Sequence, residues 1–218
     1  DTGPRPLPER LVARLTAERT AALAWHLQAD PDAALLALAH ALALPLLYGD
    51  AWGSCLDLEV SPPRLEEEHP GIRDTAAGKA LALAKARWAA LLPRDGGELW
   101  AWLLGQDAAT VRGLLGLCAG LLADAVQARH DGAERPADRA ARLVGLDMAH
   151  WWEATPDGYL AHVPKARVLE AVAEARGPRE AAHIASLKKD AMAARAARLL
   201  AGTGWLPGPL RLPEPEAA

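Results

Sequence analysis

Histidine, cysteine and carboxylate side chains are the residues of this chain that could hold a metal ion. The histidines are too widely spaced to form an H-x3-H pair, and the two cysteines, Cys55 and Cys118, lie far apart in the sequence. Asp147 and His150 share a face if their segment is helical, but two ligands do not complete a zinc site. We therefore predict no metal ligands in this sequence.

Nucleophilic catalysis and cofactor binding have no support in the motifs either. Ser54 and Cys55 follow a glycine, but no G-x-S-x-G elbow surrounds them. Gly202-Thr203-Gly204 follows a predicted helix, whereas phosphate-binding loops precede one. The sequence therefore predicts no catalytic residue, no cofactor-binding residue, no cofactor and no enzymatic activity.

The adjacent tryptophans Trp151 and Trp152 are the candidates for a partner-binding anchor. In a helix, neighbouring side chains point about 100° apart, so both rings cannot face one core. We expect one ring to be buried and the other to lie at a domain junction or a partner surface. A purely structural role in the core is the alternative. Trp205 is expected to fold back over the last helix after Gly202 or Gly204 ends it.

A basic segment is the second candidate surface. The whole chain has a formal net charge of −4, yet residues 164–200 contain eight basic and four acidic side chains. A basic cluster can contact the phosphates of DNA, and the start of a helix also favours anions. A solvated helix face is the alternative, because acidic residues interrupt the cluster and no aromatic residues interleave it. The candidates for phosphate contacts are Lys165, Arg167, Lys188, Lys189 and Arg195.

Helices must position these residues. Alanine and leucine dominate the composition, β-branched residues are few and phenylalanine is absent, which favours helix over sheet. We predict an all-α fold: a multi-helix orthogonal or bundle-like domain with a smaller C-terminal helical subdomain and no significant sheet. The first helix is expected over 8–28 and the last over 187–201.

Caps and apolar stripes mark the helices between these two. Asp30 before Pro31, Asp74 or Thr75, and Asp107 are predicted N-caps, and Thr155 is the predicted cap before Pro156. The segment 55–60 is an expected extended connector. Three glycines after Asp107 permit close backbone approach in the core. The predicted buried stripes are Leu11, Leu15, Ala22 and Trp25; Leu35, Leu38, Ala39, Leu42 and Leu46; Leu81, Ala84, Trp88 and Leu91; and Met192, Ala196 and Leu199.

The predicted organisation is a helical body over 1–130, a C-terminal helical subdomain over 136–207 and a flexible tail over 208–218. A polar loop over 130–135 marks the boundary. The N-terminus has neither a starting Met nor an apolar signal core, so we expect a C-terminal part of a longer protein. The longest apolar run, 33–48, is interrupted by His40 and Pro45 and is expected to be too short for a bilayer, which predicts no membrane partner. Two unrelated cysteines favour a reducing, cytoplasmic setting.

Several runs carry a resemblance to a known family: GLDMAHWW, YLAHVPKARVLEAVAE and LKKDAMAARAARLLAGTGWLP, with LTAERTAALAWHLQADPDAALLALAHALAL and SCLDLEV upstream. They resemble the C-terminal region of large ParB-type partition proteins, the ParB-like nuclease-domain family of proteobacterial plasmids and mobile elements. The resemblance implies a DNA-handling protein whose ParB/sulfiredoxin-like domain and helix-turn-helix domain precede this region. In better-known members, the C-terminal domain dimerises and contacts DNA non-specifically.

Two functions follow as expectations. The first is a C-terminal interaction or self-association module of a ParB-like DNA-binding protein, without catalytic activity, in a cytoplasmic protein associated with the nucleoid or a plasmid. Its partners would be DNA through the full-length protein, and a second copy or a partition-protein partner. The alternative is an auxiliary non-specific DNA-binding domain that uses 164–200. Convergence of the basic residues on one face would favour the alternative, and scattering would favour the first.

Overall fold

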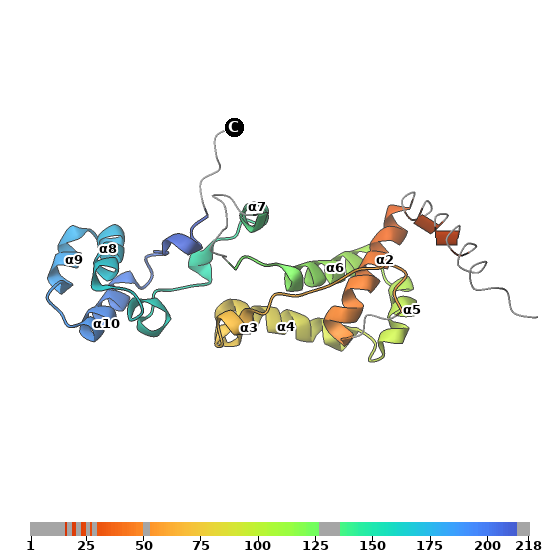
Figure 1. The fold of residues 1–218 in the computed structure, drawn as a ribbon, viewed down its shortest axis with the longest axis horizontal. Helices are drawn as coiled ribbons and strands as arrows, with labels where there is room; N and C mark the ends of the chain where they lie inside the picture. The colour runs from red at the N-terminus through yellow and green to blue at the C-terminus, as the bar shows by residue number, and fades with distance from the viewer. Residues whose placement is uncertain are drawn as a thin grey trace, which may run out of the picture. The chain divides into compact units, whose positions relative to one another are not determined.

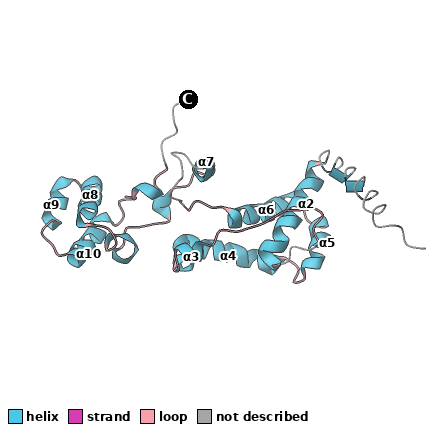
Figure 2. Cartoon of the chain, viewed as in Figure 1, coloured by secondary structure: helices cyan, strands magenta, loops and turns pink. Residues whose placement is uncertain are grey.

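The computed structural model describes residues 16, 19–20, 23–24, 27, 30–49, 53–126 and 136–212 of the chain. The stripe predicted for the first helix and the boundary loop predicted over 130–135 lie outside the described residues. All regular structure in the described part is helical, with no strand, as Figures 1 and 2 show. The prediction of an all-α fold is confirmed.

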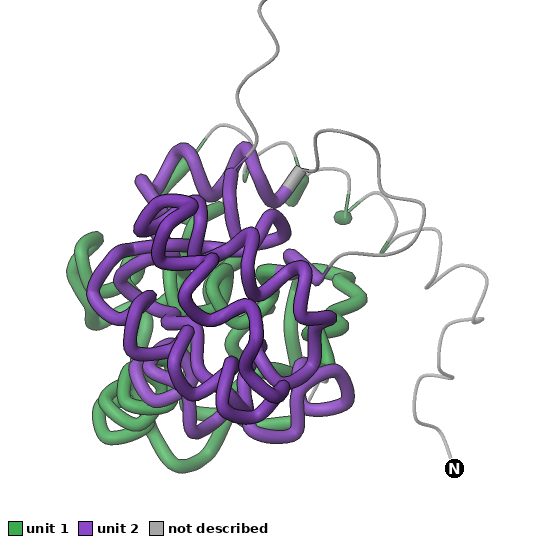
Figure 3. The backbone as a smooth tube through the Cα atoms, turned by 90° about the vertical axis from the view of Figure 1, so that its left-hand side faces the viewer, with its two compact units in different colours: residues 1–64, 81–123 green, residues 65–80, 124–218 purple. Residues whose placement is uncertain are grey.

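The chain forms two compact units, coloured separately in Figure 3. Unit 1 comprises residues 1–64 and 81–123, and unit 2 comprises residues 65–80 and 124–218. The sequence prediction placed 65–80 in the larger body. In the structure, this stretch has an Arg73–Glu66 ion pair of its own, and none of its residues belongs to the buried cluster of unit 1.

Unit 1 is built around helix α2 (Pro31–Ala43), which packs against α5 (Leu99–Leu104) and α6 (Ala108–Leu122). The predicted caps are confirmed: Asp30 Oδ1 accepts a hydrogen bond from the Ala33 amide at 3.0 Å, and Asp107 Oδ1 accepts one from the Thr110 amide at 2.8 Å. Both carboxylates satisfy backbone donors that the first helical turn leaves unpaired. The buried cluster contains Ala39, Ala43, Leu44, Leu99, Leu103, Val111, Leu114 and Cys118.

Helix α2 continues into a π-helical turn, η1 (Leu44–Tyr48), so Pro45 does not end the helical stretch. Pro45 has no amide proton to donate to the preceding turn, and the helical stretch continues past it in the wider π-helical form. Pro31–Tyr48 is therefore long and apolar enough to cross a membrane by length and composition, contrary to the expectation from the sequence. Ala39, Ala43 and Leu44 of this stretch lie in the buried cluster of unit 1.

The predicted buried stripe of helix α4 (Ala76–Leu91) is wrong. The helix has no buried residue, and Leu81 and Leu91 are 38% and 61% exposed. Its contact with the core of unit 1 is made by Trp88, followed by Leu92 just after the helix. These two residues are one turn apart, so the helix meets that core over one turn rather than along its whole apolar stripe. Its start is capped by Thr75, whose Oγ1 accepts a hydrogen bond from the Gly78 amide.

Unit 2 contains α3 (Leu65–Glu68), η2 (Ile72–Asp74), α7 (Pro136–Leu143), η4 (Met148–His150), η5 (Pro156–Leu160), α8 (Lys165–Arg176), α9 (Pro178–Ile184), α10 (Lys189–Leu200) and η6 (Gly208–Leu210). Its core joins η5 to the last three α-helices and includes Leu160, Val168, Val172, Ile184 and Met192. Thr155 Oγ1 accepts from the Gly158 amide, so this predicted cap is confirmed.

Helices α8 and α10 run side by side in the same direction, with α9 as the connection. At their starts, Lys165 Nζ donates to the Leu187 carbonyl at 2.7 Å. At their ends, Arg176 Nε donates to the Leu199 carbonyl at 2.8 Å. The predicted last helix differs from α10 by two residues at its start and one at its end, and Leu200 rather than Leu199 is buried.

The segment after α10 folds back on unit 2. Gly202 and Gly204 both have positive φ, and Trp205 packs against the buried cluster, as predicted. The expected flexible tail, 208–218, begins with the short helix η6, and Arg211 forms an ion pair with Glu174 of α8. Described structure therefore continues to Leu212, and residues 213–218 lie outside the described part.

Candidate functional site

The turn η4 positions the two candidate tryptophans of unit 2. Asp147 caps this turn: its Oδ1 accepts from the Ala149 amide at 2.9 Å, and its Oδ2 lies 3.0 Å from His150 Nδ1. Trp151 and Trp152 follow directly. The two rings differ in exposure, but neither is fully buried as was expected for one of them: Trp152 is partly buried against the core, and Trp151 is 41% exposed.

Trp151 belongs to a cluster of exposed apolar side chains, here named the Trp151 patch. Leu143 is 88% exposed, Val144 75% and Leu146 37%, and these three residues connect the end of α7 to the turn η4. Val144, Leu146 and Trp151 line one surface hollow of unit 2. Isolated exposed leucines are ordinary in soluble proteins, but a contiguous apolar patch is typical of a binding surface.

Trp152 belongs to an aromatic cluster with Tyr159 and Trp205. Its ring centroid lies 6.0 Å from that of Tyr159 and 6.5 Å from that of Trp205, and the Tyr159 and Trp205 centroids are 5.7 Å apart. Such tilted and edge-on pairs stabilise the packing beyond the burial of their surface. The cluster holds Trp152 in place, so its neighbour Trp151 is presented from an ordered segment.

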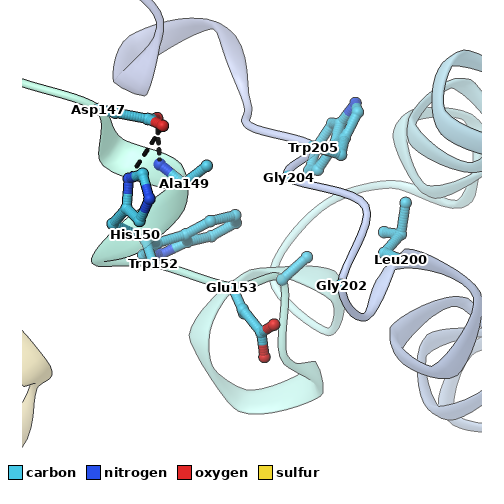
Figure 4. A pocket seen from close by; sticks show the side chains of 10 residues that line it. Asp147, Ala149, His150, Trp152, Glu153, Leu200, Gly202, Gly204 and Trp205 are labelled. Carbon is cyan, nitrogen blue, oxygen red and sulfur yellow. Dashed lines mark hydrogen bonds and ion pairs between the residues drawn. The ribbon is translucent and has the colours of Figure 1, made fainter.

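A pocket of about 240 Å³ opens between η4 and the segment after α10, as Figure 4 shows. We name it the Trp152–Trp205 pocket. Its lining includes the two indole rings and the carboxyl residues Asp147 and Glu153. Gly202 and Gly204 form part of the wall. Both have positive φ values, which residues with a side chain rarely adopt. Neither the sequence motifs nor their spacing indicated this pocket.

The candidates for phosphate contacts fall into two groups. Lys165, Lys188 and Lys189 lie together at the starts of α8 and α10, because Lys165 binds the carbonyl that directly precedes Lys188. In contrast, Arg167 is paired with Glu170 at 2.9 Å, and Arg195 lies further along α10 with an exposed side chain. The structure therefore brings together three of the five predicted residues.

The remaining basic residues of 164–200 do not join this group. Arg176 lies at the opposite end of α8, and Arg198 is in the last turn of α10. A cation is favoured at these positions by the carbonyl groups at the end of a helix. The basic residues of the segment are thus spread along α8, α9 and α10 rather than gathered at one place.

Two buried groups of unit 1 have shifted pKa values. Burial raises the pKa of the Cys118 thiol to about 11, so this side chain stays protonated and packs as an apolar residue. Burial lowers the pKa of His40, whose ring stands edge-on to Trp100 with centroids 5.1 Å apart. Within the described residues, no cluster of three or more His, Cys, Asp or Glu side chains could hold a metal ion.

Comparison with known proteins finds relatives but no family. No family model matches the chain, and no solved structure matches it significantly. Over 210 residues, the chain is 28% identical to the uncharacterized protein YubM of Escherichia coli O157:H7 and 27% identical to that of strain K12. Each alignment covers 94% of this chain and 32% of the relative. The chain therefore spans about a third of the length of the curated relatives that it matches.

Proposed function

We propose that this chain is a helical interaction and self-association module of a ParB-like DNA-binding protein, with no catalytic activity of its own. One observation carries the proposal: the Trp151 patch, an exposed apolar surface on an ordered segment of unit 2. The ParB-like part rests on the sequence resemblance. In the longer protein, DNA would be bound by domains outside this chain, in the cytoplasm at the nucleoid or a plasmid.

The chemistry of the patch suits an interface. Tryptophan is enriched among the residues whose truncation costs most in protein–protein binding, and neighbouring aliphatic side chains exclude water from it. Removing apolar surface from water contributes roughly 25 cal/mol per Å² buried. Leu143 and Val144 are more than 70% exposed in the isolated chain, so both have most of their surface left to bury in a complex.

A second copy of the chain is the occupant that we propose. A two-fold interface is self-complementary, so a surface that carries charges of both signs around an apolar centre can pair with itself. Arg139 and Arg142 precede the patch on α7, and Asp147 follows Leu146. A single-sign rim would repel its own copy, whereas the charges beside the patch are of both signs, each already engaged within the chain.

The distribution of basic residues also favours association over DNA binding. Duplex binding requires several cations to follow one phosphate backbone. Here Arg176 and Arg198 lie at the end of the α8–α10 pair opposite to the lysines, and Arg167 is neutralised by Glu170. Among the two outcomes considered from the sequence, convergence and scattering of the basic residues, the separate positions of Arg176 and Arg198 support association.

An auxiliary DNA-binding role remains a second candidate because Lys165, Lys188 and Lys189 lie together. Fluorescence anisotropy with a random-sequence duplex at two salt concentrations tests it. If three lysines contact phosphates, the logarithm of affinity falls with the logarithm of salt with a slope of about −3, and replacing all three by Gln abolishes binding. Self-association without salt-sensitive binding is the outcome that the main proposal expects.

Light scattering tests the main proposal through the mass of the chain as a function of concentration. The wild type should form dimers, and Trp151→Ala should shift the equilibrium toward monomer by at least tenfold, since a central tryptophan commonly contributes about 2 kcal/mol or more to an interface. Trp100→Ala is the matched control, because Trp100 is similarly exposed, at 38%, but lies in unit 1.

A further inference from the structure

The end of helix α7 forms a well-defined corner in the Trp151 patch. Gly145 has a φ of +63°, the left-handed conformation that glycine favours, and its amide donates a hydrogen bond to the Arg142 carbonyl at 3.1 Å. The next amide, of Leu146, donates to the Ala141 carbonyl at 2.9 Å. These two hydrogen bonds form a Schellman motif, which ends a helix in one defined geometry. The direction in which the chain leaves α7 is therefore fixed.

This corner holds a projecting side chain beside a hollow. Leu143, the last residue of α7, is 88% exposed, more than any other large apolar side chain in the described ranges. We name it the knob. A hollow of about 550 Å³, named the Trp151 hollow, begins at the next residue, Val144, and its lining continues through Leu146 to Trp151. The knob and the hollow are thus adjacent in the chain, and the Schellman motif fixes the backbone between them.

The polar residues of the Trp151 hollow are compatible with an apolar occupant. Asp147 Oδ1 accepts a hydrogen bond from the Ala149 amide at 2.9 Å, and its Oδ2 lies 3.0 Å from His150 Nδ1, as the dashed lines in Figure 4 show. An apolar side chain that enters the hollow therefore leaves this carboxylate with both partners, which avoids the cost of a buried charge without a partner. The described lining of the hollow includes no lysine or arginine.

We propose that the knob of each copy inserts into the Trp151 hollow of a second copy, so that Leu143 makes two equivalent contacts across a two-fold axis. In such an interface, residue i of one copy contacts residue j of the other, and j contacts i. Because the knob adjoins the hollow, both contacts lie near the axis and form together. A different partner that filled only the hollow would leave the knob in water, whereas a second copy buries both. This inference rests on the proposed self-association and names the contact that produces it.

Leu143→Ala removes the knob and leaves the hollow intact. Each lost knob should weaken association about tenfold, because the burial of a leucine side chain contributes at least that factor. A dimer loses two knobs, so sedimentation equilibrium should show dimerisation about a hundredfold weaker than in the wild type. Leu104→Ala is the matched control, since Leu104 is likewise the last residue of its helix, α5, and is 63% exposed in unit 1. This control should dimerise as the wild type does, and circular dichroism verifies that both variants keep their helix content.

A mixture of two variants tests the pairing itself. Leu143→Ala lacks the knob but keeps the hollow, whereas Trp151→Ala has a damaged hollow but keeps the knob. A mixed dimer therefore retains one intact contact, and a dimer of either variant alone retains none. With a fluorescent label on one variant, the mixture should associate about tenfold more tightly than either variant alone. If the two residues contributed independently, the affinity of the mixed dimer would lie between those of the two variants.

Two outcomes would overturn this inference alone. They are a Leu143→Ala variant that dimerises as Leu104→Ala does, and a mixed dimer of intermediate affinity. In both cases, dimerisation of the wild type and its loss in Trp151→Ala would leave the proposed function in place. A wild type that stays monomeric at every concentration would overturn the inference and the proposed function together, and would leave the Trp151 patch to a partner other than a second copy.

Discussion

The indole Nε1 of Trp205, in the segment after α10, donates a hydrogen bond to the carboxylate of Glu174 on α8 at 2.6 Å. Arg211 binds both oxygens of the same carboxylate, with its terminal nitrogens at 2.6 and 3.2 Å. One side chain of α8 therefore fixes the returning segment that forms one wall of the Trp152–Trp205 pocket. The integrity of the pocket depends on this contact.

Replacing Glu174 by Gln should loosen the returning segment. The expected loss of stability is modest, about 0.5–1 kcal/mol, because the carboxylate is half exposed and water screens the ion pair. The control is Glu170→Gln, one turn earlier on α8, which removes only the Arg167 pair. Urea unfolding measures both variants. Equal effects of the two substitutions would contradict a special role for Glu174.

The same carboxylate predicts a dependence on acid pH. Hydrogen bonds from Arg211 and Trp205 lower the pKa of Glu174 below its ordinary value of 4.5. The folded state therefore holds this proton less tightly than the unfolded state does. The contribution of Glu174 is fully present above pH 4.5 and is lost as the pH falls through the lowered value. Glu174→Gln should remove this part of the acid sensitivity, measured as the difference between the two unfolding curves.

Two glycines of α6 should respond oppositely to alanine. A Cβ at Gly116 meets nothing within 4 Å, so Gly116→Ala should stabilise unit 1 by about 0.5–1 kcal/mol through helix propensity. A Cβ at Gly113 would stand 3.0 Å from Trp88 Cζ2. Gly113→Ala should therefore be the less stable of the two by at least about 1 kcal/mol, since overpacking costs 1–3 kcal/mol. Thermal unfolding measures the stability of both variants. A Gly113→Ala variant as stable as Gly116→Ala would show that the Trp88 side chain moves aside at no cost in stability.

His40 predicts a weakening of unit 1 in mild acid. The side chain is 4% exposed, its Nδ1 has no hydrogen-bond partner among the described residues, and burial lowers its pKa below 6.5. The unfolded chain binds the proton more tightly, so stability is full above pH 6.5 and declines as the pH falls toward the lowered pKa. Hydrogen exchange of α2 and α6 amides measures this decline. His40→Leu should abolish it, and an unchanged slope in that variant would assign the effect to other histidines.

Local features of the fold were predictable from the sequence because their causes are local. Asp30, Asp107 and Thr155 cap helices through contacts with amides three residues away, and their side-chain types alone indicate this. The difference in exposure between Trp151 and Trp152 also follows from the angle between adjacent side chains. It holds although the segment is a short 3-10 turn rather than an α-helix.

Features that depend on packing between distant segments were not predictable. The stripe of α4 could not show that only its Trp88 turn reaches the core of unit 1. The hydrogen bond from Lys165 to the Leu187 carbonyl depends on the parallel course of α8 and α10, which no sequence motif indicates. The Trp152–Trp205 pocket joins residues about fifty positions apart. The nearest signal was the pair Gly202 and Gly204, two residues without side chains whose positive φ values favour glycine.

The two neighbouring tryptophans should differ in their effect on folding. Trp152 contacts Tyr159 and Trp205 in the aromatic cluster, so Trp152→Ala should cost about 2–3 kcal/mol, somewhat less than for a fully buried ring. Trp151 is 41% exposed and should tolerate alanine within about 0.5 kcal/mol. Urea unfolding compares the two variants. A large loss in Trp151→Ala would indicate a structural rather than an interfacial role.

The measurement that tests the central claim most directly is the mass of the chain by sedimentation equilibrium across a concentration series, for the wild type, Trp151→Ala and Trp100→Ala. The proposed function predicts a reversible dimer for the wild type and Trp100→Ala, and a monomer for Trp151→Ala that is folded to the same extent. A wild type that stays monomeric at every concentration, or a Trp151→Ala variant that dimerises as the wild type does, would contradict it.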